Sequence, residues 1–179
     1  MTGDNQNFLY CPECGQKNTV TYVNRRHWVC SSCGFNLYNN VAAAVGVIIP
    51  DEAGRALFIR RAKEPRAGFL ALPGGFIDPG ERAEEAALRE CAEETALALT
   101  DLRYLASFPN IYVYKTVTYS TCDIFFTARA EDFSPRAADG EAAGFALESV
   151  RTREDIAALP LAFPSAARAL EAWLASLSK

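Results

Sequence analysis

Apolar segments of strand length alternate with amphipathic segments along most of the chain. Residues 41–49, 56–61, 102–108, 112–128 and 144–150 are rich in β-branched and aromatic residues and predict strands. A turn at residues 51–54 predicts that the first two strands form a hairpin. Segments without internal Gly or Pro predict helices at residues 81–96, 153–158 and 164–177. The pattern therefore predicts a mixed α/β body.

The first 40 residues have a different character. Four of the six cysteines form two C-x2-C pairs separated by 15 residues, at Cys11, Cys14, Cys30 and Cys33. This spacing is typical of a structural four-cysteine Zn²⁺ site, and the intervening residues 19–23 and 27–29 predict short strands of a zinc ribbon. The alternative is two disulfides in a secreted domain, but the N-terminus shows no signal peptide. We therefore expect a cytoplasmic protein with a ribbon at residues 1–38 and a body at residues 39–179.

Charge and hydropathy restrict the class of partner. The 179 residues include 18 Lys and Arg against 22 Asp and Glu, a net charge of −4 that argues against nucleic-acid binding by bulk positive charge. No apolar run approaches the roughly 20 residues that span a membrane. Nucleic-acid contact through the ribbon stays open, because one locally basic edge is formed by Lys17, Arg25, Arg26 and His27.

The acidic residues are concentrated on one predicted helix. Glu90, Glu93 and Glu94 stand at i, i+3 and i+4, so their carboxylates share one face and repel one another. One interpretation is a solvated surface face, compensated in part by Arg89. The other is a divalent cation, Mg²⁺ or Mn²⁺ given oxygen ligands alone, that binds a phosphate-bearing substrate. Gly75, preceded by another glycine, allows close backbone approach and offers its carbonyl oxygen as a further ligand.

The spacing of these residues resembles the box of the Nudix hydrolases, G-x5-E-x7-R-E-U-x-E-E-x-G-U, where U is bulky and apolar. The positions that match are Gly75, Glu81, Arg89, Glu90, Glu93, Glu94 and Leu97. Cys91 replaces one bulky apolar residue, and Ala96 replaces the glycine that ends the helix in a left-handed conformation, at a cost of roughly 1 kcal/mol. The resemblance covers about residues 41–150 and implies the Nudix fold, a mixed sheet sandwiched by helices.

The resemblance implies a hydrolase that cleaves the pyrophosphate linkage of a nucleoside diphosphate joined to another group. The implied magnesium ligands are Gly75, Glu90, Glu93 and Glu94. Arg89 is expected to orient these carboxylates, and the general base is Glu90, Glu94 or the loop residue Glu141. For Glu141 the alternative is an ordinary solvated loop residue.

The sequence leaves the nucleotide open among ADP-ribose, NADH- or FAD-type dinucleotides and dinucleoside polyphosphates. A ribbon before a Nudix body is similar to the NADH pyrophosphatase group, but residues 159–164 lack the glutamine and tryptophan of that group's signature. Arg60 and its neighbour Arg61 are candidates to meet substrate charge. Tyr112 and Tyr114 share a strand face and either stack on a base or pack in the fold. Two further hypotheses are a homodimer, by analogy, and a nucleotide- or RNA-binding module whose ribbon contacts a partner.

Overall fold

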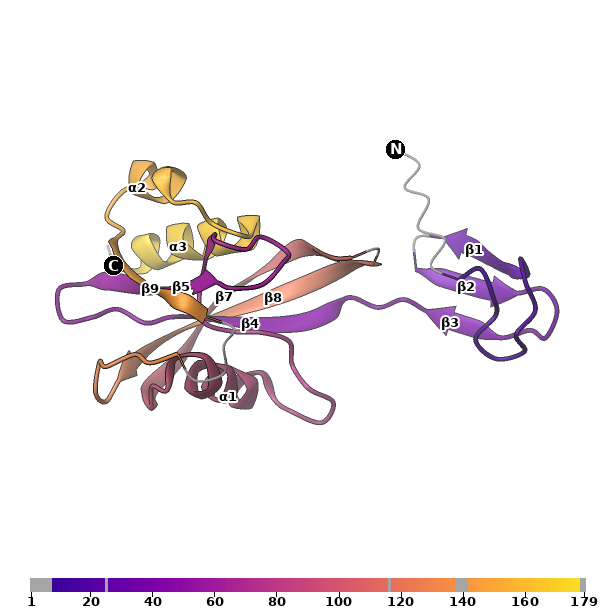
Figure 1. Cartoon of the computed structure of the whole chain (residues 1–179), viewed down its shortest axis with the longest axis horizontal. Helices are drawn as coiled ribbons and strands as arrows, with labels where there is room; N and C mark the ends of the chain where they lie inside the picture. Colours follow the sequence, from indigo (N-terminus) through magenta and orange to yellow (C-terminus); the bar gives the residue numbers. More distant parts are fainter. Residues whose placement is uncertain (1–7, 25, 116, 138–141, 178–179) are drawn as a thin grey trace.

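The structure, a computed structural model, describes residues 8–24, 26–115, 117–137 and 142–177. Arg25 and Glu141, both named above, lie outside these residues. At the N-terminal end, β1 (Val20–Asn24), β2 (His27–Cys30) and β3 (Asn36–Tyr38) form an antiparallel sheet of their own (Figure 1). The two expected ribbon strands are confirmed, and β3 is added to them. The division into domains 1–38 and 39–179 stays a prediction.

The body contains two three-stranded sheets. The first has the order β4 (Ala42–Ile48), β8 (Val117–Ala130) and β7 (Leu99–Tyr114), with β4 parallel to β8. The second has the order β6 (Leu70–Ala71), β5 (Arg55–Arg61) and β9 (Ala142–Ser149). Figure 1 shows helix α1 (Ala83–Thr95) on one side of the strands and helices α2 (Arg153–Ala158) and α3 (Pro164–Leu177) on the other. The predicted mixed α+β fold with helices on both sides is confirmed.

The alternation of side chains along the strands explains why helices cover both sides. Val47 of β4 packs in the cluster that contains Ala87 and Cys91 of α1, whereas the adjacent Ile48 packs in the cluster that contains Leu170 of α3. Successive side chains of a strand point to opposite faces, so a continuous apolar run requires an apolar partner on each face. The residues that α1 buries against the strands are all small, namely Ala86, Ala87, Cys91 and Thr95.

The predicted hairpin between residues 41–49 and 56–61 is wrong, although the chain does reverse at the predicted turn. Pro50 and Ala56 form an isolated antiparallel bridge, and the Leu57 N–H donates to the Ile49 carbonyl at 3.0 Å. The strands then separate, because β4 pairs with β8 in one sheet and β5 pairs with β6 and β9 in the other. The turn residues therefore predicted a reversal of the chain but not the pairing of the strands.

A second difference concerns the expected break near Pro109. Strand β7 continues through this residue, which lies opposite Cys122 of β8, and the chain reverses only after Tyr114, where Lys115 has φ 54°. Proline lacks an N–H group but is tolerated in an edge strand, and β7 is the edge of its sheet. Tyr112 therefore belongs to the end of β7 and not to the start of the next strand.

No helix among the described residues is long and apolar enough to span a membrane.

The end of α1 shows the consequence of Ala96 at the glycine position of the Nudix box. Ala96 is the C-cap, with φ 57° and ψ 18°, and its N–H donates to the Ala92 carbonyl at 2.9 Å. Ala96→Gly removes a Cβ from a left-handed position, so we expect the free energy of unfolding to rise by about 1 kcal/mol in urea unfolding. The control is Ala98→Gly at an exposed residue outside the left-handed region, which should not stabilise. A destabilised Ala96→Gly variant contradicts the prediction.

Candidate active site

The loop before α1 is fixed between β4 and the helix by backbone hydrogen bonds. The N–H groups of Val45 and Val47 donate to the carbonyls of Gly75 and Pro73, both at 2.8 Å, and the Gly74 N–H donates to Glu94 Oε2 at 2.8 Å. A Cβ on Gly74, which has φ 145°, would collide with the Val45 carbonyl. These contacts leave no space for a side chain and require glycine at this position.

Gly75 is required for a different reason. A Cβ on Gly75 would come within 2.6 Å of the Glu90 carboxyl group, so the glycine makes the space in which this carboxylate lies. Its carbonyl accepts the Val45 N–H, and a carbonyl oxygen has two lone pairs, so it has the capacity to bind a second partner.

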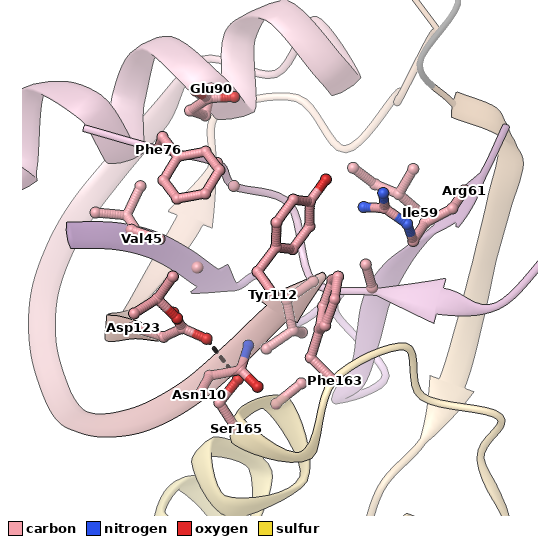
Figure 2. A pocket seen from close by; sticks show the side chains of 18 of the residues that line it. Val45, Ile59, Arg61, Phe76, Glu90, Asn110, Tyr112, Asp123, Phe163 and Ser165 are labelled. Atoms are coloured by element: carbon pink, nitrogen blue, oxygen red, sulfur yellow. Dashed lines mark hydrogen bonds between the residues drawn. The ribbon is translucent and has the colours of Figure 1, made fainter. Parts of the chain in front are cut away.

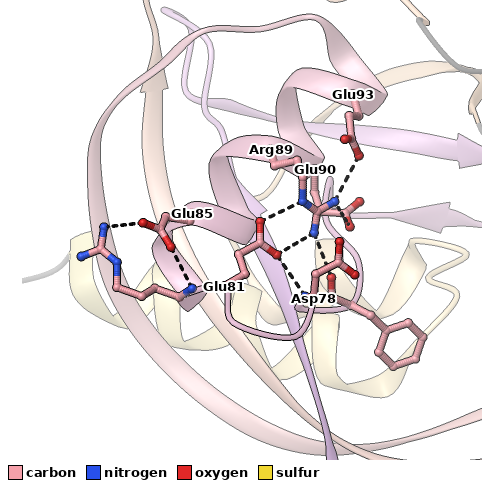
Figure 3. A network of polar contacts seen from close by, with 8 residues as sticks. Asp78, Glu81, Glu85, Arg89, Glu90 and Glu93 are labelled. Carbon is pink, nitrogen blue, oxygen red and sulfur yellow. Dashed lines mark hydrogen bonds and ion pairs between the residues drawn. The ribbon is translucent and has the colours of Figure 1, made fainter.

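Arg89 organises the carboxylates of the helix (Figure 3). Its guanidinium donates to Glu81 at 2.8 and 2.9 Å, to Glu90 at 2.8 Å, to Glu93 at 3.1 Å and to the Phe76 carbonyl at 3.1 Å. The hydrogen bonds from Arg89, with a further one from the Asp78 N–H, lower the pKa of Glu81 from 4.5 to about 2. In turn, Glu81 and then Glu90 raise the pKa of Arg89. The network gathers the carboxylates of Glu81, Glu90 and Glu93 around one guanidinium cation.

This network predicts a pH dependence of stability. Glu81 has a lower pKa in the folded chain than in the unfolded chain, so the unfolded chain binds more protons on acidification. The stabilisation by Glu81 is therefore complete above its unfolded pKa of 4.5 and is lost as the pH falls towards about 2. We expect the free energy of unfolding, measured in urea, to fall more steeply between pH 5 and 3 for the wild type than for Glu81→Gln. The exposed Glu84→Gln should show the same pH dependence of the free energy of unfolding as the wild type. The same dependence in all three proteins would refute the prediction.

A cavity of about 480 Å³ opens beside the loop and α1. Figure 2 shows Glu90 on one side and Asp123, Asn110 and Ser165 on the opposite side, with Tyr112 between them. We call the side lined by Asp78, Glu90 and Glu94 the acidic end and the opposite side the far end. The volume is in the range of small-molecule sites.

The structure brings some of the candidate residues together and leaves others apart. The candidates that line the cavity are Gly75, Glu90, Glu94, Tyr112 and Tyr114. Glu93 is not among the lining residues; its side chain is 52% exposed and contacts Arg89. Arg60 also lies outside the lining and donates to the Gly68 carbonyl at 2.9 Å.

Arg61, the candidate named together with Arg60, lines the cavity, and its guanidinium lies 5.3 Å from the centre of the Phe163 ring. Two further lining residues, Phe163 and Asp123, were not selected from the sequence. Phe163 comes from the segment before α3, and nothing in its local sequence distinguishes it. Asp123 has a signal, because it is a carboxylate in the middle of strand β8, directly before the apolar residues 124–126.

The acidic end is suited to a hard divalent cation. Glu90 and Glu94 supply carboxylate oxygens to one cavity, and Gly75 leaves the space around the Glu90 carboxylate. In the described part of the chain, no three acidic side chains have oxygens within 4.8 Å of one another. This arrangement is compatible with Mg²⁺, which usually takes one or two carboxylates and completes its shell with water and substrate phosphate.

The four cysteines of the ribbon form a second metal-binding arrangement. Their sulfur atoms all lie within 4.8 Å of one another, with Cys11 to Cys33 and Cys14 to Cys30 at 3.8 Å. Sulfurs about 2.3 Å from one Zn²⁺ at the corners of a tetrahedron lie about 3.8 Å apart. A disulfide requires about 2.05 Å, and the cysteines are free thiols. The set can hold one metal ion with four ligands.

Fold, box and cavity define the class of protein. The chain matches the NUDIX domain family over residues 41–173 and belongs to that family. In particular, it is 27% identical over 104 residues to the NAD-capped RNA hydrolase NudC of Vibrio vulnificus, covering 58% of this chain and 39% of that protein. It is 46% identical over 63 residues to the ADP-ribose pyrophosphatase of Methanocaldococcus jannaschii, covering 35% and 37%. The chain thus spans about two-fifths of the length of these curated relatives.

Solved structures show the same fold. The NUDIX hydrolase of Nitrosomonas europaea superposes with a TM-score of 0.67 and 21% identity, covering 94% of this chain and 92% of its own. The NUDIX domain of Shewanella oneidensis NrtR, solved in complex with ADP ribose, superposes with a TM-score of 0.64 and 21% identity, covering 78% and 90%. At these identities the likeness supports the fold alone.

Proposed function

We propose that this protein hydrolyses the pyrophosphate linkage of a nucleoside diphosphate joined to another group, with ADP-ribose as the leading substrate. The observation that carries the proposal is the acidic end of the cavity, where Glu90 and Glu94 lie beside a loop that has no space for side chains. Relatives named as an ADP-ribose pyrophosphatase and an NAD-capped RNA hydrolase support this class of linkage.

Different residues have different proposed roles in this reaction. Gly75, Glu90, Glu93 and Glu94 are the proposed holders of Mg²⁺ or Mn²⁺, which when bound neutralises the diphosphate and activates a water. Arg89 donates hydrogen bonds to Glu90 and Glu93 and so orients their carboxylates. Glu90, Glu94 and Glu141 remain the candidate bases. Arg61, in place of Arg60, is positioned in the lining to meet substrate charge.

A substrate panel tests this proposal. Purified protein is incubated with ADP-ribose, NADH, FAD and diadenosine polyphosphates, with Mg²⁺ or with EDTA, and products are separated by chromatography. We expect AMP from at least one substrate in Mg²⁺ and none in EDTA. Failure to release AMP from every member of the panel would overturn the proposal.

The ribbon is proposed to hold a structural Zn²⁺, because four thiolates fill a tetrahedral shell and leave no position for substrate. A binding module that contacts RNA through this ribbon is the second candidate, supported by the relatives named as acting on NAD-capped RNA. Release of NMN and 5′-phosphorylated RNA from NAD-capped RNA would indicate hydrolysis, whereas retention of the intact cap on the protein would indicate binding alone. The homodimer and the cytoplasmic location stay predictions.

A further inference from the structure

The far end of the cavity contains a buried carboxylate that the proposed hydrolysis does not use. Asp123 is 9% exposed and lines the cavity. The Thr121 hydroxyl donates to one of its oxygens at 2.6 Å. The Ser165 hydroxyl donates to the other at 2.6 Å (Figure 2). Both hydroxyl residues are almost fully buried, so two elements, β8 and the start of α3, fix the orientation of this carboxylate.

The charge of Asp123 is not balanced by a neighbouring cation. No lysine or arginine of the described residues forms an ion pair with it, and each oxygen accepts only one hydroxyl hydrogen bond. A carboxylate offers about four acceptor positions, so Asp123 can accept further hydrogen bonds from a molecule in the cavity. Leaving a buried carboxylate partly unsatisfied is unfavourable, which favours a ligand group that donates N–H and disfavours phosphate.

Aromatic side chains lie between the far end and the acidic end. The rings of Tyr112 and Phe163 are 5.6 Å apart at 42°, and those of Tyr112 and Phe76 are 5.5 Å apart at 89°. All three residues line the cavity. Such flat apolar surfaces bind the face of a base, and Asn110 adds an amide beside Asp123 (Figure 2). The cavity thus combines a cation-binding end, an aromatic middle and an acceptor end.

We propose that Asp123 determines base specificity by accepting a hydrogen bond from the amino group of adenine. This inference rests on the proposed function for the orientation of the nucleotide, with the diphosphate at Glu90 and Glu94 and the base at Asp123. Hypoxanthine has a carbonyl oxygen where adenine has the amino group, and this oxygen faces the carboxylate without a hydrogen bond. The site therefore selects 6-amino purine nucleotides and rejects their deaminated counterparts.

The test compares ADP-ribose with its hypoxanthine analogue, IDP-ribose. For the wild type we expect kcat/KM to favour ADP-ribose about 10-fold or more, the size of effect for one lost hydrogen bond to a buried charged group. In Asp123→Asn, the amide can donate to the hypoxanthine carbonyl, so the ratio should fall to about one or below. The exposed Asp132→Asn is the matched control and should keep the wild-type ratio.

The ratio of kcat/KM for the two substrates distinguishes a change in base specificity from a loss of folded protein. Both substrates are measured with the same preparation, so the fraction of folded protein cancels in the ratio. An Asp123 that only joins α3 to β8 would leave the ratio unchanged in Asp123→Asn, and this result would overturn the inference. Calorimetric binding of AMP and IMP to the wild type needs no turnover and no variant; equal affinities would also overturn it. A preference for AMP without turnover of any substrate would refute the hydrolase and leave the base site standing.

Discussion

Glu94→Gln is expected to hydrolyse ADP-ribose roughly 100- to 10,000-fold more slowly than the wild type, the range for loss of a catalytic acid or base. Glu94 lines the acidic end of the cavity, and its Oε2 accepts the Gly74 N–H at 2.8 Å. The glutamine carbonyl oxygen can still accept this hydrogen bond, so the loop stays attached to the helix. The substitution thus removes the negative charge and keeps this contact with the loop.

The measurement is kcat/KM in saturating Mg²⁺, together with the free energy of unfolding of each variant. Glu84→Gln is the matched control, because it makes the same substitution on an exposed residue of α1 outside the cavity lining, and we expect it to keep the wild-type rate. A Glu94→Gln variant that is folded and retains more than about one-tenth of the wild-type rate would contradict the assignment of this carboxylate to the reaction.

Loss of the cysteine-bound metal is expected to unfold the ribbon. Structural Zn²⁺ contributes an apparent 10–16 kcal/mol in zinc-finger peptides, roughly the whole stability of a small domain. The ribbon's described strands are three to five residues long, and its buried apolar residues are few, with Cys11, Trp28 and Cys30 among them. Cys30→Ser removes one buried ligand. We therefore expect it to lose the metal and the hydrogen-exchange protection of β1 and β2.

Elemental analysis of the wild type should give one Zn²⁺ per chain, and Cys30→Ser should give none. Cys122→Ser is the control, because this half-buried cysteine lies in β8 and outside the four-sulfur cluster. Turnover of ADP-ribose by Cys30→Ser should persist, since the acidic end belongs to the body. Full zinc occupancy and unchanged exchange protection in Cys30→Ser would show that the cluster does not hold the ribbon together.

Local patterns predicted those features that depend on neighbours along the chain. Helices α2 and α3 begin and end at the residues that their composition predicts, and α1 begins two residues later than expected. The left-handed Ala96 was expected from a single position of the box. The helical spacing of Ala167, Leu170, Leu174 and Leu177 predicts a buried face on α3. Leu170 is buried as this spacing predicts, but Leu177 is 65% exposed. Helical periodicity gives the spacing of a face, while the packing of the neighbouring strands decides how far it extends.

Contacts between segments far apart in the sequence could not be predicted from local patterns. Strands β4 and β5 are adjacent in sequence yet belong to different sheets. Strand preference depends on tertiary context, so the apolar pattern did not indicate which strands pair. Arg61 and Arg60 are neighbours in one strand, and alternation directs only Arg61 to the cavity. The sequence offered no basis for choosing between them.

The sequence by itself determined the acidic helix, the glycine loop and the four-cysteine spacing, because each consists of residues whose geometry is fixed by a single turn, loop or helix. Only the tertiary structure decided which carboxylates face the cavity and which chemistry lies opposite them. Asp123 and Ser165 are 42 residues apart and meet because α3 packs on the sheet that contains β8. Such a site depends on burial and long-range packing, which local periodicity does not encode.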